Sequence, residues 1–168
     1  MRVAVTGTPG TGKTTATGLV DSDLDMVNLN DLIREEELST GEDPERGSLL
    51  ADIEGLRERL GGRDDVLIES HLAHHFEADR VVVLRCHPRR LRERLLDRGE
   101  DESKAKENAE AEALDVILSE AVEEHGLDSV YEIDTTDRTP EAVADDIEAV
   151  IDGGRAPAAG TVDFLDYL

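Results

Sequence analysis

Residues 7–14 read Gly-Thr-Pro-Gly-Thr-Gly-Lys-Thr and fit the pattern G-x-x-x-x-G-K-T at every defined position. A short apolar run, residues 3–5, precedes this stretch, and residues 14–16 can open a helix behind it. A loop in that setting points its backbone N–H groups at the phosphates of a nucleotide. A plain glycine-rich turn is the alternative, but it does not require every position of the pattern. The stretch therefore predicts a strand, a phosphate loop and a helix that bind a nucleoside triphosphate.

Within this loop the residue types divide the work of holding a nucleotide. We assign Gly10, Gly12, Lys13, Thr14 and Thr15 to nucleotide binding. The Lys13 ammonium would reach the β- and γ-phosphates, which also makes it a candidate catalytic residue. The Thr14 hydroxyl would hold Mg²⁺, so ATP is expected to bind together with Mg²⁺.

Acidic residues dominate the composition. The chain has 41 Asp and Glu against 18 Lys and Arg, a formal net charge of −23, and only Lys13, Lys104 and Lys106 are lysines. The acids are spread over the whole length rather than gathered in a tail. Such a surface is typical of a protein that works in very high salt. The repulsion between its acidic side chains is screened there, because the Debye length falls to about 3 Å at 1 M. Disorder is the alternative, but the regular alternation of strand and helix patterns argues against it.

Other features of the chain restrict its class. A length of 168 residues suits one domain with a core. No apolar run approaches the roughly 18–20 residues of a membrane span, and no basic and apolar leader precedes the first strand. Cys86 is the only cysteine, which excludes an internal disulfide. We expect a cytoplasmic protein without a membrane partner.

The strand and helix patterns alternate, which predicts a parallel sheet with helices on both faces. Strands are expected at residues 2–6, 25–29, 66–68, 80–84 and 130–133. Helices are expected at residues 12–20, after a cap at Asn30 or Asp31, and at 48–60, 88–98, 104–124 and 139–151, with polar breaks at 39–47 and 99–103. This is the three-layer α/β fold of P-loop NTPases with a five-stranded parallel sheet. We expect one domain over residues 1–152 and a flexible acidic and apolar tail over residues 153–168.

Ligands of such sheets bind beyond the carboxyl ends of the strands. Glu69 ends the third expected strand, where a second acid commonly helps to hold Mg²⁺; the competing interpretation is a surface acid. His71 follows closely and is expected to be a polar residue beside the phosphates. A transition-metal site built from Glu69, His71, His74 and His75 is disfavoured, because no matching pair of ligands occurs elsewhere and zinc would duplicate a site that already has Mg²⁺. His74 and His75 receive no role.

Arginines gather in one part of this acidic chain. Seven of the fifteen fall between residues 80 and 98, namely Arg80, Arg85, Arg89, Arg90, Arg92, Arg94 and Arg98. Some would form ion pairs along a helix, which suits residues 89, 90 and 92. Arg94 and Arg98 are the better candidates for a clamp on a transferring phosphoryl group. Arg34 lies where a second phosphate would be held.

Four stretches lie in order along the chain: residues 7–15, residues 28–36, Glu69-Ser70-His71, and residues 94–99 with Lys104 and Asn108 behind them. Together they resemble the adenylate kinase isoenzyme 6 family, the archaeal and eukaryotic nuclear branch of the adenylate kinases, over roughly residues 1–150. The resemblance implies a nucleoside monophosphate kinase that moves a phosphoryl group from ATP to AMP and also hydrolyses ATP. It implies an AMP-binding segment near residues 28–51 and a lid near residues 97–107.

The resemblance also implies roles for single residues and a partner. Arg98 would bind ATP and, with Lys13 and His71, is a candidate catalytic residue, whereas Arg34 and Asp31 would bind AMP. The family is linked to late maturation of the small ribosomal subunit through a ribosomal protein of its platform, of the uS-eleven type. We expect that protein and the immature subunit as partners, with no direct sequence-specific binding of nucleic acid. The acidic composition points to a haloarchaeal member.

The chain departs from the family pattern in three places. Glu69 stands where eukaryotic members have Asp. Residues 70–74 replace an Asp-Gly-x-Pro-Arg run that supplies another AMP contact, so acceptor choice is expected to be loose. The lid is short and lacks cysteine, so no structural zinc is expected. A GTPase is disfavoured because no Asn-Lys-x-Asp run occurs, but an ATP-hydrolysing assembly factor with secondary kinase activity and a non-enzymatic nucleotide sensor stay as alternatives.

Overall fold

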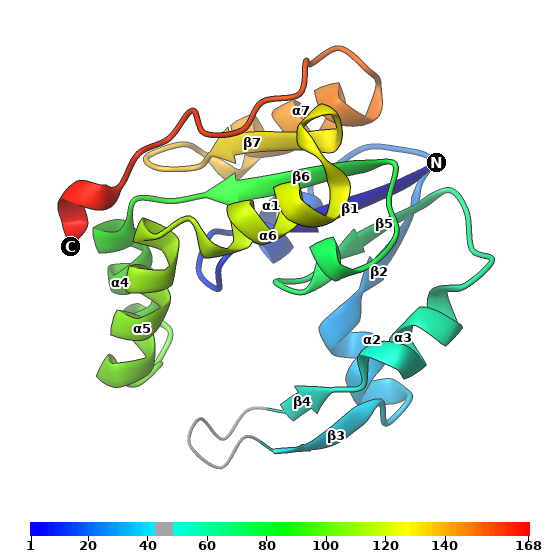
Figure 1. The fold of residues 1–168 in the computed structure, drawn as a ribbon, viewed down its shortest axis with the longest axis horizontal. Coiled ribbons are helices and arrows are strands. Elements are labelled where there is room, and N and C mark those ends of the chain that lie inside the picture. Colours follow the sequence, from blue (N-terminus) through cyan, green and yellow to red (C-terminus); the bar gives the residue numbers. More distant parts are fainter. Residues whose placement is uncertain (43–48) are drawn as a thin grey trace.

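A five-stranded parallel sheet forms the centre of the molecule in the computed structural model, which describes residues 1–42 and 49–168 (Figure 1). The strands are β1 (Arg2–Thr6), β2 (Asp25–Asn28), β5 (Val66–Glu69), β6 (Arg80–Arg85) and β7 (Val130–Asp134). Their order is β2-β5-β1-β6-β7, and every neighbouring pair is parallel. The predicted five-stranded α/β fold is confirmed. The central position of β1 puts the loop that follows it in the middle of the sheet's carboxyl edge.

Helices cover both faces of the sheet because side chains alternate along each buried strand. Ala4 of β1 packs in one core with α2 (Leu29–Glu35), α3 (Ile53–Leu60), the 3₁₀ turn η1 (Ala73–His75) and α6 (Val116–His125). Val3 and Val5 face the other core, with α1 (Lys13–Thr17) and α7 (Pro140–Ile151). A third apolar cluster joins α4 (Pro88–Asp97) to α5 (Glu102–Ala113). The predicted three layers are thus present.

Two excursions leave the sheet (Figure 1). An antiparallel pair, β3 (Ser39–Glu42) and β4 (Leu49–Ala51), lies between α2 and α3, where the sequence predicted a polar turn and the start of a helix. Part of the predicted AMP-binding segment, residues 43–48, lies outside the described residues. The second excursion is the α4–α5 hairpin, in which residues 98–101 alone connect the two helices.

Three further helix boundaries differ from the predictions. The side chain of Asn28 caps α2 by accepting from Asp31 N at 3.1 Å, so neither Asn30 nor Asp31 is the cap. Helix α1 ends at Thr17, because Gly18 follows and the Thr17 hydroxyl bonds back to the helix. The expected long helix to residue 124 is broken into α5 and α6 at Asp115, which has a φ of 56°. Its carboxylate accepts from Arg85 at 2.5 Å, a tertiary contact that no local pattern reveals.

The C-terminal tail, residues 153–168, packs along β7, whereas the sequence predicted a flexible segment (Figure 1). Ala158 forms a parallel bridge with Tyr131, and Glu132 N donates to Ala158 O at 2.8 Å. Phe164 is buried and meets the ring of His87 edge-on, at 5.3 Å between centroids. A final 3₁₀ turn, η3 (Leu165–Tyr167), ends the chain, and a further one, η2 (Leu127–Ser129), precedes β7. No described helix is long and apolar enough to cross a membrane.

Candidate functional site

The loop between β1 and α1 has the shape that its glycines allow. Gly12 directly precedes α1 and has a φ of 89°. Residues with a side chain rarely adopt this backbone conformation. Gly10 packs against the α4 side chains, since a Cβ built there would lie 3.1 Å from Leu95. These two positions shape the loop and hold it against α4, next to the start of the α4–α5 hairpin.

Lys13 is folded into this loop. Its ammonium donates to Gly7 O at 2.8 Å and to Thr8 O at 3.2 Å, and the residue is only 8% exposed. Burial lowers the pKa of Lys13 to about 8, against the opposing influence of Glu69, while Arg98 lowers it further. The side chain therefore lies at the centre of the loop and loses its proton more readily than a lysine in water.

Glu69 joins the loop to the end of β2. The Thr14 hydroxyl donates to its carboxylate at 3.2 Å, and the Asn28 amide donates to the other carboxylate oxygen. Burial raises the pKa of Glu69, and Lys13 opposes that shift. A hydroxyl and a carboxylate are the hard oxygen donors that Mg²⁺ takes beside nucleotide phosphates, so these residues fit the ion. Asn28 belongs to residues 28–36, one of the four stretches that carry the family resemblance, but the sequence predicted no role for it in the site.

His71 lies close enough to Lys13 for the two groups to interact electrostatically. Burial lowers the pKa of His71 to about 4, with Lys13 as the next cause. The imidazole is neutral at physiological pH, so it can donate one hydrogen bond and accept another but carries no positive charge to the phosphates.

The remaining predicted residues differ in how they relate to the loop. Arg98 caps the end of α4, is exposed, and pairs with Glu100 at 3.6 Å. Asp31 is exposed in the first turn of α2 and near enough to Glu69 to raise its pKa. Arg34 lies exposed in the last turn of the same helix. In the described part of the chain, Arg34 makes no hydrogen bond to the loop, so the structure does not join it to the other candidates.

A hollow of about 270 Å³ opens beside the loop on the α1–α7 side. Half-buried Arg94 borders it and donates to Gly10 O at 3.3 Å. The lining residues come from the loop, α1, α4, the connection between β7 and α7, and the start of α7: Thr11, Gly12, Thr15, Ala16, Arg94, Thr135, Arg138, Pro140 and Val143. Apart from the loop, Thr15 and Arg94, the sequence singled out none of this surface, because its parts are far apart in the chain.

A cluster of buried, charged side chains contacts the loop, and the sequence did not predict it. Arg85, at the end of β6, pairs with Glu132 at 2.6 Å, Asp115 at 2.5 Å and Glu112 at 3.3 Å. Glu112 also accepts from the Thr8 hydroxyl at 3.0 Å, which ties α5 to the loop. Arg85 thus serves the interior rather than a phosphate. Glu112 lies in a Glu-rich run in which nothing local distinguishes it.

Several known proteins are similar to this chain in sequence or in fold. Residues 3–115 match the family model described as "AAA domain". A protein of Natronomonas pharaonis named "Putative adenylate kinase" is 68% identical, and the match covers all of both chains. Proteins of the same name from Halobacterium salinarum (61% identical, all of both chains) and Methanothermobacter thermautotrophicus (45%, 99% and 98%) also match. A shikimate kinase structure from Bacteroides thetaiotaomicron superposes with a TM-score of 0.57 at 16% identity, over 90% of this chain and 98% of the other. That last likeness concerns the fold alone.

Proposed function

Because the chain belongs to the AAA-domain family and, within it, to the group of proteins named "Putative adenylate kinase", we propose that it transfers the terminal phosphoryl group of ATP to AMP. The observation that carries this proposal is the contact set of Glu69. Its two carboxylate oxygens accept from Thr14 of the phosphate loop and from Asn28, which caps the helix that bears Asp31 and Arg34. One residue therefore connects the expected donor side to the expected acceptor side.

On the donor side, the loop N–H groups and Lys13 would bind the phosphates of ATP. Lys13 has to leave the carbonyls of Gly7 and Thr8 and turn toward the phosphates, a short motion within the loop. Thr14 and Glu69 would hold Mg²⁺, which neutralises charge on the phosphates when bound. The hollow beside Arg94 suits the nucleoside, since the apolar side chains in its lining and a guanidinium favour a planar base.

On the acceptor side, Asp31 and Arg34 on α2 would hold AMP, with the Arg34 guanidinium on its phosphate. Arg98 begins the segment that joins α4 to α5 and already influences the pKa of Lys13. Closure of the α4–α5 hairpin would bring this guanidinium onto the transferring group, where planar donors stabilise spread negative charge. Neutral His71 would donate or accept a hydrogen bond beside the phosphates.

We propose ATP hydrolysis as a second activity of the same site. The observation that favours it is the short connection within the lid near residues 97–107: residues 98–101 alone connect α4 to α5, and Arg98 is exposed. A lid this short excludes water incompletely, so water competes with AMP as the acceptor.

The test is ADP formation from ATP in the presence of Mg²⁺ and molar KCl, with and without AMP. We expect turnover that AMP stimulates, and an Arg34→Ala variant that needs at least about tenfold more AMP while its ATP affinity is unchanged. Turnover that AMP does not stimulate would refute the kinase proposal and favour the hydrolysing assembly factor. A complete lack of turnover would favour a nucleotide sensor.

Two variants at basic residues check the site itself. Lys13→Ala is expected to lose both activities, because it removes the charge at the centre of the loop. Arg63→Ala, at an exposed residue after α3 and outside the loop and the lid, is the control and should keep both. Hydrolysis that persists in Lys13→Ala would show that the site assignment is wrong.

We further propose that the protein acts in small-subunit maturation through a basic ribosomal protein of the uS-eleven type, in the cytoplasm. Its support is the net charge of −23, which suits a basic partner. Affinity purification from cells at native salt should recover that protein and immature small subunits. Their absence from material that retains nucleotide-dependent activity would refute the partner and leave the kinase proposal intact.

A further inference from the structure

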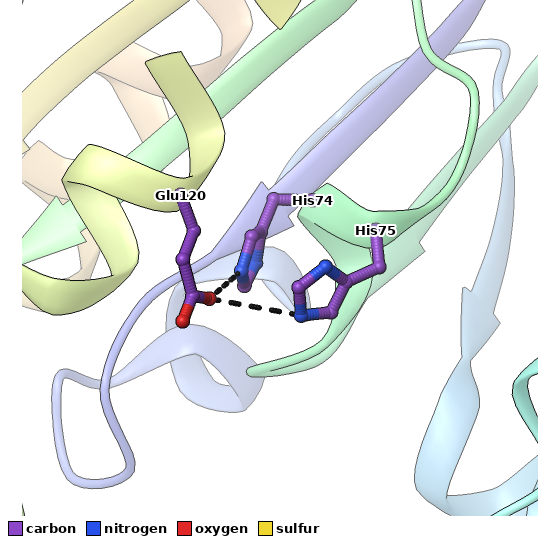
Figure 2. Close-up of side chains that lie close together, drawn as sticks. All are labelled: His74, His75 and Glu120. Atoms are coloured by element: carbon purple, nitrogen blue, oxygen red, sulfur yellow. Dashed lines mark hydrogen bonds and ion pairs between the residues drawn. The ribbon is translucent and has the colours of Figure 1, made fainter. Parts of the chain in front are cut away.

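Two histidines without a role in the nucleotide site converge on one glutamate. His74 and His75 close η1, and Glu120 lies one turn into α6 (Figure 2). The Nε2 atom of His74 is 2.7 Å from Glu120 Oε2, and the Nε2 atom of His75 is 3.6 Å from the same oxygen. The two rings lie 4.1 Å apart between centroids. Residues separated by 45 positions in sequence thus present three potential ligand atoms to one point.

The other nitrogen of each ring is already engaged. His75 Nδ1 lies 2.6 Å from a carboxylate oxygen of Glu124. A carboxylate only accepts hydrogen bonds, so His75 Nδ1 carries the proton and the neutral ring has its lone pair on Nε2. That lone pair faces the Glu120 oxygen, which is also an acceptor. A metal ion between the two atoms would accept an electron pair from each of them.

His74 also has a partner on its other ring nitrogen. Its Nδ1 lies 2.7 Å from the hydroxyl of Thr6, and its backbone carbonyl accepts from His125. The Thr6 hydroxyl can donate or accept, so without a metal the neutral His74 ring can give its Nε2–H to Glu120, and a bound ion would take the place of that proton. Histidines that bind metal ions usually donate their other N–H to such a partner, which fixes the ring and its tautomer.

We propose that His74 Nε2, His75 Nε2 and a carboxylate oxygen of Glu120 bind one divalent transition-metal ion of the Zn²⁺ class, with a fourth position for water. Bonds of about 2.0–2.1 Å in tetrahedral geometry place ligand atoms roughly 3.3 Å apart. The observed separations of 2.7 Å and 3.6 Å lie on either side of that value, so small rotations of the side chains suffice. Imidazole with carboxylate suits Zn²⁺, Co²⁺ or Ni²⁺ better than Mg²⁺.

The ion would tie η1, which follows the strand that ends at Glu69, to α6, which follows the α4–α5 hairpin. It would also fix the hydrogen bond from His74 Nδ1 to Thr6, the residue directly before the phosphate loop. The site is separate from the Mg²⁺ position at Thr14 and Glu69 and from the cysteine-free lid for which no zinc is expected. Its role is to brace the floor of the nucleotide site, and the proposal does not depend on which nucleotide binds.

The test is binding of Co²⁺ and Zn²⁺ to chelator-treated, nucleotide-free protein in molar KCl with excess Mg²⁺, which suppress binding by exposed acids. We expect one Co²⁺ per chain with the visible absorption of a low-symmetry site, displaced by Zn²⁺. At about 100 times its dissociation constant, Zn²⁺ should raise the melting temperature by about 5 °C or more.

Two ligand variants and two matched controls locate the ion. Glu120→Gln and His75→Gln should each weaken binding at least about tenfold. Glu123→Gln, exposed on the same helix, and Glu69→Gln, at the expected Mg²⁺ position, should leave it unchanged. His75 is partly exposed, so its variant remains informative if Glu120→Gln fails to fold. The proposal is refuted by a lack of stoichiometric binding, by binding that survives both ligand variants, or by binding that is lost in Glu69→Gln.

Discussion

Lys13 shows how a single side chain is tuned by its place in the loop. Its ammonium donates to two carbonyl oxygens and is almost fully buried, so the charged form is less stable than in water. Burial lowers its pKa to about 8, and the exposed Arg98 adds to the effect. A bound triphosphate would reverse this by supplying negative charge. The lysine is therefore ready to gain stabilisation when the nucleotide arrives.

This environment predicts an alkaline limit on ATP use. As pH rises through about 8, free Lys13 loses its proton, and kcat/KM for ATP should fall by about tenfold per pH unit above that value. Steady-state rates between about pH 6 and pH 10 at constant salt test this. A kcat/KM that stays flat to pH 10 would contradict the low pKa.

The lowered pKa of Lys13 also makes the free energy of unfolding depend on pH. The folded pKa lies below the unfolded value of 10.5, so between about pH 8 and 10.5 the unfolded chain binds more protons than the folded one. The contribution of Lys13 to the free energy of unfolding therefore rises with pH across this window.

At the scale of elements, the junction between α5 and α6 is held by a charge cluster and not by helix propensity. Arg85 reaches three carboxylates from α5, the α5–α6 break and β7. Glu112 additionally accepts from the backbone N–H of Cys86 at 2.8 Å and from Thr8. Burial raises the pKa of Glu112 and Arg85 opposes the shift. This cluster explains why the chain turns at Asp115 instead of continuing one long helix.

Replacing Glu112 with Gln should reduce the free energy of unfolding by about 2 kcal/mol, because it removes one charge from a buried pair while Arg85 keeps two partners. The melting temperature should fall by about 4–8 °C. Glu110→Gln, which affects only a long, exposed contact with Lys106, is the control and should change stability by less than about 0.5 kcal/mol. Thermal unfolding measures both, and equal effects would show that the cluster contributes nothing special.

The C-terminal tail behaves as an added element of the sheet edge. Its bridge to β7 and the buried ring of Phe164 place it over Arg85, whose guanidinium lies 5.4 Å from the ring centroid. Thr161 also donates through both its backbone N–H and its hydroxyl to Glu132, at 2.6 Å each. The tail thereby covers the outer side of the charge cluster.

Phe164→Ala should cost about 3 kcal/mol of unfolding free energy, since it removes a buried ring and opens the Arg85 cluster to water. Leu165→Ala, at a side chain that is 55% exposed, should cost less than about 0.5 kcal/mol. Chemical denaturation at constant salt measures the two. Equal stability of the Phe164 variant and the unsubstituted chain would mean that the tail packs only weakly.

At the scale of the whole molecule, the charge of −23 sets the conditions under which the fold is stable. Acidic side chains repel one another over about 10 Å at 0.1 M salt but only about 3 Å at 1 M. The melting temperature should therefore rise by roughly 10 °C or more between about 0.1 and 2 M KCl. Melting curves in KCl, compared with uncharged sucrose at equal osmolality, test this. A melting temperature independent of KCl would remove the support for a high-salt protein.

The sequence by itself determined the succession of strand, phosphate loop and helix at the start of the chain, and it determined the fold class. The phosphate-loop pattern and the run of valines in residues 81–83 are local signals, because a buried strand and a glycine turn depend on neighbouring residues. The same local signals identified Lys13 and Thr14, and the end of a strand identified Glu69. These predictions depend on short stretches of chain, and the structure brings the three residues together.

Only the tertiary structure decided what distant residues do for one another. Asn28, Glu112 and the hollow beside Arg94 became parts of the site through contacts across the sheet. Asp115 breaks a helix because it reaches Arg85, and the tail is ordered because β7 offers it an edge. His74 and His75 acquire a partner in Glu120 only when η1 packs on α6. Such contacts join residues far apart in the chain, so no pattern within a short window of sequence contains them.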